Sequence, residues 1–597
     1  MGAIAGYVDW TRWIEDEPQV IARLNGEQSP CGQAGAHTWI GPHVALGHAR
    51  VLHEPAGVLQ PVTVHEPGLT VAVVFSGRLH NRDDLRDYLL GHGRRLRTRT
   101  DADLVAHAYV HWGSDAVRRL SGHFALAVWD SKEQQLLLAR DRLGAVPLYY
   151  TATRHGLVFA SRMPTLLAHP EVVAELDETG IAELVAMPAA PTPGTALLRG
   201  VCEVRPASLV RAHRGGLGVH SYWRLCSQPH EDNLPDTTIR SRELLSAAVG
   251  RQLAAESALG ALCSGGIGSS ALAVLAAPRM RERGLDLATF TFPDDGRGAH
   301  ERDHRYAVMV AEHAKTIHHK VAAPRSALEE SDLRRAAGSA ADLPAGADAT
   351  AQLALLRHAH TVTADVLCGT GAATVFGGHR WLRTDYDRRA GFPWMRHQPA
   401  LVDLLKASVV AQAQPGRHAY EAYHTALDTV AHLPGETGPA RRFREISWLT
   451  HTHFLPRQLT RLHAQASAAG VQMCLPYLDD DLVTYAWNIP WEIRTADGAD
   501  QAILRRTVAD LLPRPVLGRR HQPHLSTLSR GQAQVVIKRA QQLLCSTAAP
   551  ALRLFDRTKV RRLLAEYQHR PDAATAARLQ NVVEIDAWLR RHRVRFR

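Results

Sequence analysis

The spacing of apolar residues changes near residues 226–238, and this change divides the chain. Before it, short apolar or alternating runs separated by turn residues predict β-strands. After it, helical patterns alternate with isolated buried strands, which is typical of a parallel sheet flanked by helices. We therefore predict an α+β half of stacked antiparallel sheets over 1–225, a linker over 226–238 and an α/β half over 239–597.

The expected elements are short in the first half. A helix is predicted over 101–112, with Asp101 as its N-cap. The last ~150 residues have the periodicity of a nearly all-helical segment. Strands are predicted over 44–46, 69–75, 124–129, 135–139, 157–160, 258–263, 287–292 and 364–368.

The composition is that of a globular chain, with 45% hydrophobic and 22% charged residues among 597. This length is too great for a single core. The seven cysteines are scattered without CxxC pairs, so neither a zinc site nor a disulfide framework is indicated, and a reducing cytoplasm is the expected location. Cys31, the first of them, is expected to be a simple buried or surface residue.

The charge and hydropathy patterns restrict the partners. A net charge of +11 favours an acidic ligand such as a nucleotide or pyrophosphate. The arginines are dispersed and no aromatic–basic motif is present, so we expect no nucleic-acid partner. No apolar run reaches the length of a membrane span and the N-terminus lacks the regions of a signal peptide, so no membrane partner is expected.

A glycine-rich loop follows a predicted buried strand and leads into a helix expected over 271–277. Backbone amides at a helix N-terminus attract anions, and glycines let a phosphate approach the main chain. Serine hydroxyls add further donors. The alternative is an ordinary strand-to-helix turn. The predicted nucleotide-binding residues are Ser264, Gly265, Gly266, Ser269 and Ser270.

This loop resembles the SGGxDSS pyrophosphate loop of class B asparagine synthetases. The likeness continues in order through 366–378, similar to the family's LSGEGADELFGG, and 475–479, similar to VPFLD; residues 120–125 and 140–144 match the glutaminase domain. The resemblance implies an N-terminal-nucleophile glutaminase-like sandwich followed by an ATP-pyrophosphatase-type synthetase. In that synthetase ATP activates a carboxylate as an acyl-adenylate, and an amine then forms an amide. ATP and Mg²⁺ are therefore the expected cofactors, with release of AMP and pyrophosphate.

The glutaminase positions depart from the family. The family's nucleophile is a cysteine whose own amine activates its thiol, and Gly2 stands at that position. Ser76 replaces an oxyanion-hole asparagine, and Arg78 replaces a glutamate that holds glutamine. Glutamine hydrolysis is therefore not expected. Arg50 and Asp101 match family residues, and we expect them to be surface charges.

The synthetase positions depart as well. The metal-holding aspartate of SGGxDSS is Gly268, the acidic pair of GADE is Ala373 and Thr374, and the family's transition-state lysine aligns with Gln501. Mg²⁺ prefers carboxylate and water oxygens as ligands, and none of these side chains supplies an anionic oxygen. The metal site is thus predicted to be weakened, and the catalytic residues stay unassigned.

Other charged residues are candidates to compensate. An acidic run follows the strand predicted over 287–292, although such runs usually face solvent. A basic cluster stands where the family binds pyrophosphate. The weak metal candidates are Asp294, Asp295 and Asp303, and the candidate phosphate-binding residues are Arg519, Arg520 and His521.

Two functional hypotheses follow from the resemblance. Loss of the glutaminase is shared with lasso peptide cyclases and β-lactam synthetases, so the first is a lasso-cyclase-like ligase that acts on a peptide or small carboxylate. Its expected partners are a precursor-recognition protein and a protease. The second is a degenerate pseudo-synthetase that keeps the fold and serves as a partner or peptide-binding subunit. It is motivated by the residues at 268, 373, 374 and 501.

Overall fold

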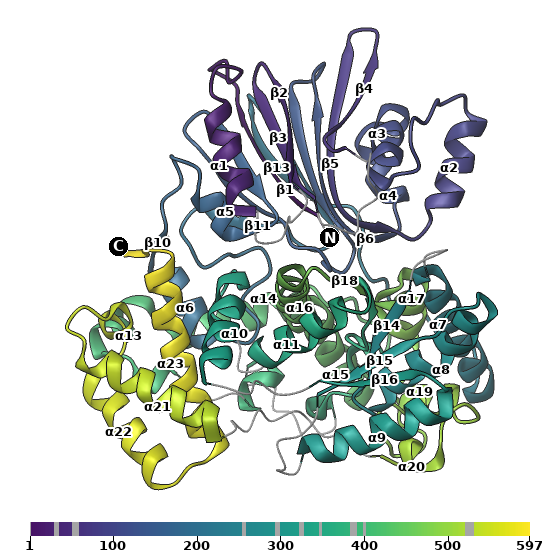
Figure 1. Cartoon of the computed structure of the whole chain (residues 1–597), viewed down its shortest axis with the longest axis vertical. Helices are drawn as coiled ribbons and strands as arrows, with labels where there is room; N and C mark the ends of the chain where they lie inside the picture. Colours follow the sequence, from purple (N-terminus) through teal and green to yellow (C-terminus); the bar gives the residue numbers. More distant parts are fainter. Residues whose placement is uncertain are drawn as a thin grey trace.

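A computed structural model describes most of the chain (Figure 1). The described residues are 2–28, 35–50, 59–253, 258–292, 299–321, 327–345, 349–382, 391–397, 401–519 and 530–597. A sandwich of β-strands stands above a parallel sheet with its helices, and the C-terminal helices lie beside that sheet's domain (Figure 1).

The N-terminal sandwich consists of two six-stranded antiparallel sheets, as predicted. Their inner faces share a core that includes Ile4, Val74 and Phe159. One sheet has the order β11-β8-β9-β1-β3-β2, with β11 (Val201–Glu203), β8 (Tyr149–Ala152), β9 (Gly156–Ala160), β1 (Ala3–Asp9), β3 (Val44–Ala49) and β2 (Ala36–Gly41). The other has the order β13-β12-β7-β6-β5-β4, with β13 (Gly216–Ser221), β12 (Ser208–His213), β7 (Gln135–Arg140), β6 (Gly122–Asp130), β5 (Leu69–Leu79) and β4 (Val62–Glu66).

The helices of this half cover the sandwich. α1 (Pro18–Gln28) packs on β1 and β3, and α3 (Asp101–Trp112) packs on β5, beside α2 (Arg82–Gly91). The predicted helix over 101–112 is confirmed at both ends. Its predicted N-cap is wrong, because Thr100 caps the helix by accepting from the Asp103 N–H at 3.2 Å.

The second half contains a five-stranded parallel sheet, again as predicted. Its order is β16-β15-β14-β17-β18, with β16 (Ile317–Lys320), β15 (Ala288–Thr291), β14 (Leu259–Leu262), β17 (Asp365–Leu367) and β18 (Gln472–Cys474). The predicted strands correspond to β14, β15 and β17, whereas β16 and β18 were not predicted. One helix group, α7 (Leu234–Gln252), α8 (Ile267–Glu282) and α9 (Ala299–Ala314), and a second, α10 (Ala327–Ala340), α11 (Ala349–His360) and α16 (Leu455–Ala469), flank the sheet.

Residues 234–238 of the expected linker already form the first turn of α7, so helical structure begins earlier than the composition indicated. The domain boundaries themselves stay a prediction. The remaining helices are α4 (Ala116–Arg119), α5 (Met163–Leu167), α6 (Glu178–Ala186), α12 (Ala372–Val375), α13 (Ala407–Ala413), α14 (Pro415–Asp428), α15 (Gly438–Leu449), α17 (Asp480–Asn488), α18 (Trp491–Arg494), α19 (Ala502–Thr507), α20 (Arg514–Leu517), α21 (Arg530–Cys545), α22 (Arg557–His569) and α23 (Ala573–Arg591).

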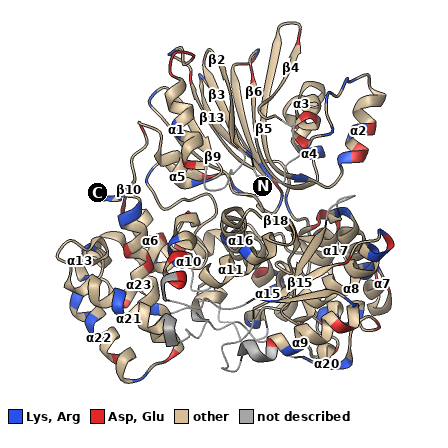
Figure 2. Cartoon of the chain, viewed as in Figure 1, with Lys and Arg blue, Asp and Glu red and all other residues tan. Residues whose placement is uncertain are grey.

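The two halves share a core and a small sheet. β19 (Arg595–Phe596) pairs in parallel with β10 (Glu175–Leu176). Leu176 and Val185 from the N-terminal half pack in one buried cluster with Trp588 from α23. Charged residues of both signs mingle on the outer helices (Figure 2). Among the described helices, none is both long and apolar enough to cross a membrane.

Candidate nucleotide site and its surroundings

The glycine-rich loop joins β14 to α8, and its first two glycines have different structural roles. Gly265 has a φ of +67°, and a Cβ there would lie 2.4 Å from Tyr306 Cβ. Only glycine suits this turn. Gly266 has an ordinary φ of −77°, and a Cβ there would meet only Ser264 Oγ, at 3.4 Å. The space beside Gly266 therefore stays open for a ligand to approach the main chain.

The serines of the loop divide into two groups. Ser269 Oγ accepts from the Ser264 N–H at 3.2 Å, lies 3.2 Å from Ser264 Oγ and donates to Gly266 O at 3.2 Å. Ser270 is fully buried, and its hydroxyl has no hydrogen-bond partner among the described residues. The predicted nucleotide residues thus lie in one loop. The hydrogen bonds of Ser264 and Ser269 fix its conformation, and Ser270 is buried beneath its surface.

The Arg519 guanidinium lies beside this loop. It donates from Nη1 to Ser264 O at 2.8 Å and stacks over the Tyr306 ring at 4.8 Å from its centroid. Its Nη2 forms an ion pair with Asp303. The expectation that Asp303 belongs to a solvated acidic run is therefore wrong, because this carboxylate is 9% exposed and held by Arg519. The other predicted members of these two clusters lie outside the described residues: Asp294, Asp295, Arg520 and His521.

Small residues fill the position of the family aspartate. A Cβ on Gly268 would lie 2.7 Å from Ala372 Cβ, at the start of α12, so an aspartate there requires α12 to move. The Tyr477 hydroxyl donates to Gly268 O at 2.8 Å, and this hydrogen bond restrains the loop backbone. Sequence reasoning missed Tyr477, although it belongs to the matched 475–479 run.

The remaining departures have structural partners. Thr374 Oγ1 lies 3.0 Å from His379 Nε2, and the His379 ring stacks on Trp381. Gln501 is buried against Gly378, where a Cβ would lie 2.7 Å from Gln501 Cδ. Within the described ranges, no group of three or more His, Cys, Asp or Glu residues is arranged to hold a metal ion. Gly268, Ala373 and Thr374 carry no carboxylate, so these positions do not fit a carboxylate-held Mg²⁺.

The glutamine-site positions of the N-terminal half are occupied by internal contacts. Ser76 Oγ donates to Gly2 O at 2.6 Å. Arg78 Nη2 donates to both carboxylate oxygens of Asp365, at 3.0 and 3.2 Å, so it reaches β17 of the other half. Sequence reasoning missed this contact. Of these two positions, Arg78 joins the two halves, whereas Ser76 bonds within the N-terminal half.

The expectation that Asp101 is a surface charge is wrong. Asp101 is 8% exposed; it accepts from the Leu79 N–H at 2.9 Å and from Arg82 Nη2 at 2.6 Å. Arg50 is half-buried, with its Nε shielded from solvent. Asp101 therefore fixes the end of β5 through a buried charge-assisted hydrogen bond. Cys31 lies outside the described residues.

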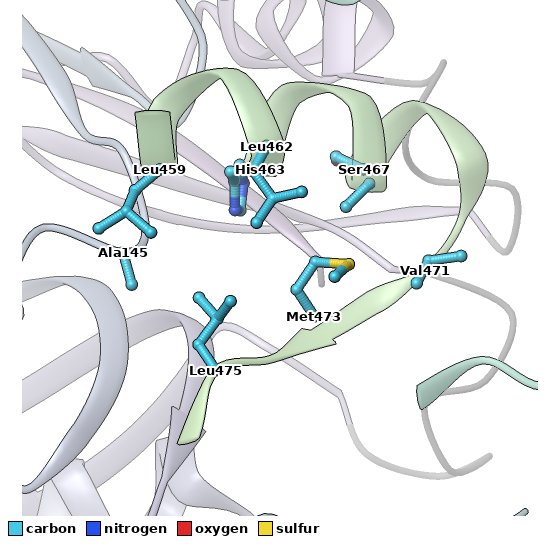
Figure 3. Close-up of a pocket in the computed structure, with 9 residues that line it drawn as sticks. Ala145, Leu459, Leu462, His463, Ser467, Val471, Met473 and Leu475 are labelled. Carbon is cyan, nitrogen blue, oxygen red and sulfur yellow. The ribbon is translucent and has the colours of Figure 1, made fainter. Parts of the chain in front are cut away.

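A mostly apolar hollow lies between the two halves (Figure 3). It has a volume of about 300 Å³, including the part open to solvent. Ala145 of the N-terminal half lines it together with residues of α16 and β18, and its polar side chains are those of His463 and Ser467. Burial lowers the pKa of His463 to about 3, so this ring is neutral. The hollow therefore carries no charge at neutral pH. Sequence reasoning missed this hollow, although the helical spacing of apolar residues on α16 could have indicated a buried helix here.

An antiparallel double-sheet domain of amidotransferase type thus sits on a parallel sheet that carries a phosphate-type loop. The glutamine amidotransferase domain family matches residues 1–223, and the asparagine synthase family matches residues 240–590. The chain belongs to the asparagine synthase family. The predicted family and the two-part fold are confirmed. So is the prediction, at the level of the family, of an ATP-dependent carbon–nitrogen ligase that releases AMP and pyrophosphate.

Two relatives in Bacillus subtilis (strain 168) match over most of the chain. Asparagine synthetase [glutamine-hydrolyzing] 3 is 32% identical over 540 residues, which cover 88% of this chain and 87% of that protein. Asparagine synthetase [glutamine-hydrolyzing] 1 is 23% identical, with coverage of 85% and 83%. Similarity on this scale extends across both halves and is not confined to the loop.

Proposed function

We propose that this protein is an ATP-dependent amide ligase that activates a peptide carboxylate and joins it to an amine that does not come from glutamine. The observation that carries the proposal is the Arg78–Asp365 pair. Arg78 replaces the glutamate that holds glutamine in the resembling enzymes, and its guanidinium is engaged with a carboxylate of the other half. A cation at this position repels the ammonium group of glutamine, while the nucleotide loop keeps its open face at Gly266.

The chemistry follows the family reaction. A carboxylate oxygen attacks the α-phosphorus of ATP, which forms an acyl-adenylate and releases pyrophosphate. The amine then attacks the acyl carbon, the amide bond forms, AMP leaves, and the amine proton passes to solvent. The loop amides around Gly266 and the Arg519 guanidinium are the groups that this proposal assigns to the phosphates.

A lasso-cyclase-like macrolactam is the specific product proposed. The carboxylate is then an aspartate or glutamate side chain of a precursor peptide, and the amine is that peptide's N-terminus. Precursor-recognition and protease partners belong to the same proposal. The uncharged hollow around His463 supports it, because it lies between the halves and favours an apolar or neutral group over an ion.

The test mixes the full chain with ATP, Mg²⁺ and precursor peptides encoded near its gene. We expect AMP and pyrophosphate release and a product one water lighter than the peptide. A matched peptide whose acidic side chain is replaced by its amide should give neither, and an N-acetylated peptide should give no ring. Formation of asparagine from aspartate and glutamine, or absence of AMP with every peptide, would contradict the proposal.

The pseudo-synthetase is the second candidate. The specific observation that favours it is the packing of Gly268 against Ala372, which leaves no room for the family aspartate. Calorimetry separates the two candidates. Peptide binding without ATP turnover supports the pseudo-synthetase, whereas Mg²⁺-dependent ATP binding with AMP release rejects it.

A further inference from the structure

A second hollow lies between the two halves, away from the nucleotide loop. It is bounded by α6, the segment after it, α16 and α23 (Figure 1) and has a volume of about 400 Å³, including the part open to solvent. One part of its wall is apolar, with Leu184, Leu197 and Ile585. The other part carries the polar side chains of Arg457, Arg461 and Asn581.

Arg457 is buried there without a matching anion. This residue is 7% exposed, and the one side-chain hydrogen bond that it forms with a described residue runs from Nη2 to Pro344 O at 3.4 Å. Its Nε has no acceptor, and no carboxylate pairs with it, among the described residues. Burial, and next the nearby Arg461 charge, lower the pKa of Arg457 to about 9. A buried guanidinium in this state is costly unless an anion reaches it.

The neighbouring charges do not neutralise this guanidinium. Arg461 is one helical turn further along α16 and donates from Nη2 to Pro188 O at 3.3 Å, so the hollow contains two cations. Glu183 also lines it, but this carboxylate binds His418 Nε2 at 2.7 Å and the Thr192 N–H at 2.9 Å.

Two further carboxylates, those of Glu203 and then Asp342, act on Arg457 only at longer range. Glu203 accepts from Arg140 Nη1 at 2.7 Å, and Asp342 accepts from the Met163 N–H at 3.1 Å and lies 4.0 Å from Arg162 Nε. Within the described part of the chain, no carboxylate therefore forms an ion pair with Arg457.

We propose that this hollow binds a small carboxylate with an aliphatic body. The carboxylate meets the guanidinium groups of Arg457 and Arg461, whose planar forks suit its two oxygens, and the Asn581 amide adds a further donor. The aliphatic body packs against Leu184 and Ile585. A phosphate has no group to place on that apolar wall. Because α6 comes from the N-terminal half and α16 and α23 from the other, the ligand ties the two halves together.

The experiment titrates isovalerate into the full chain by calorimetry. We expect saturable binding that Arg457→Gln weakens at least tenfold, since the change removes a charge-assisted contact. Arg417→Gln is the matched control, because the Arg417 side chain is exposed and its partners among the described residues are its neighbours Glu421 and Gln414. Isovalerate should also raise the midpoint of thermal unfolding of the unmodified chain and of Arg417→Gln, but not that of Arg457→Gln.

A second variant keeps the proposal testable if Arg457→Gln does not fold. Arg461→Gln then carries the test and should lose isovalerate binding in the same way. Absence of saturable binding, or equal binding by the arginine variants and the control, would overturn the proposal. Inorganic phosphate forms the second arm, and preferential binding of phosphate would overturn the assignment to a carboxylate. None of these readouts depends on ATP turnover, so the outcome is independent of the proposed ligase activity.

Discussion

Substitution of the two loop glycines by alanine, one at a time, should separate folding from nucleotide binding. At Gly265 an alanine has to adopt a φ of +67°, which costs about 1–2 kcal/mol for a residue with a Cβ. Its methyl would also lie 2.4 Å from Tyr306 Cβ and 2.7 Å from the Ala307 nitrogen, which adds about 1–3 kcal/mol of overpacking. We therefore expect Gly265→Ala to destabilise the synthetase half by about 2–5 kcal/mol.

Gly266→Ala is the matched variant. The φ of −77° is ordinary, and the methyl would meet only Ser264 Oγ at 3.4 Å, so stability should change by less than about 1 kcal/mol. The same methyl occupies the open face of the loop. ATP affinity should therefore fall at least tenfold, a loss of about 1.4 kcal/mol.

Differential scanning calorimetry of the nucleotide-free protein and titration with ATP measure the two effects separately. We expect a lower unfolding temperature for Gly265→Ala and an unfolding temperature near that of the unmodified chain for Gly266→Ala, with weakened ATP binding. Equal unfolding temperatures for the two variants would refute the steric reasoning. Unchanged ATP affinity in Gly266→Ala would refute the assignment of this loop to phosphate.

Three further predictions concern the contacts between and within the halves. Arg78→Ala should lower the free energy of unfolding by about 3–5 kcal/mol, because the Asp365 side chain, which is 9% exposed, loses its guanidinium partner. Adding Asp365→Asn should recover part of this loss, as measured by urea unfolding. The absence of any recovery would contradict this account. Gly2→Cys alone should yield no glutamate from glutamine in a coupled assay, since Arg78 still carries a cation where the substrate amine would lie; measurable release would show that this pocket is intact. The hydrogen bond to Glu183 raises the pKa of His418. The Glu183–His418 pair therefore contributes its whole stabilisation below the ordinary histidine pKa, and this stabilisation is lost as pH rises through the raised pKa. His418→Gln should remove this decline in unfolding temperatures measured from about pH 5 to about pH 9, and an unchanged profile would argue against it.

The sequence predicted those features of the fold that local patterns determine. The bounds of α3 and the strands β14, β15 and β17 follow from apolar spacing within a few residues, and the turn at Gly265 follows from its glycine. β16 and β18 were missed although they match β15 and β17 in length, at four and three residues, because polar residues interrupt their sequences, IHHK and QMC, and only their hydrogen bonds to neighbouring strands define them.

The site was predictable only in part, for a related physical reason. The glycine-rich loop is contiguous, so its residues could be named from sequence. Arg519 and Asp303 are 216 residues apart and Arg78 and Asp365 are 287 apart. Their pairing depends on the packed fold, and no local pattern in the sequence indicates it. The resemblance indicated candidate positions for functional residues but not the contacts that the side chains at those positions make.

The short ladder between Glu175–Leu176 and Arg595–Phe596 has a consequence for engineering. Its second strand is supplied by residues beyond α23, so a fragment cut after the sandwich lacks a backbone partner for β10 and exposes apolar side chains that α23 normally covers. Chimeras that graft the sandwich of one relative onto the synthetase of another should therefore aggregate unless residues 573–597 are transplanted with it.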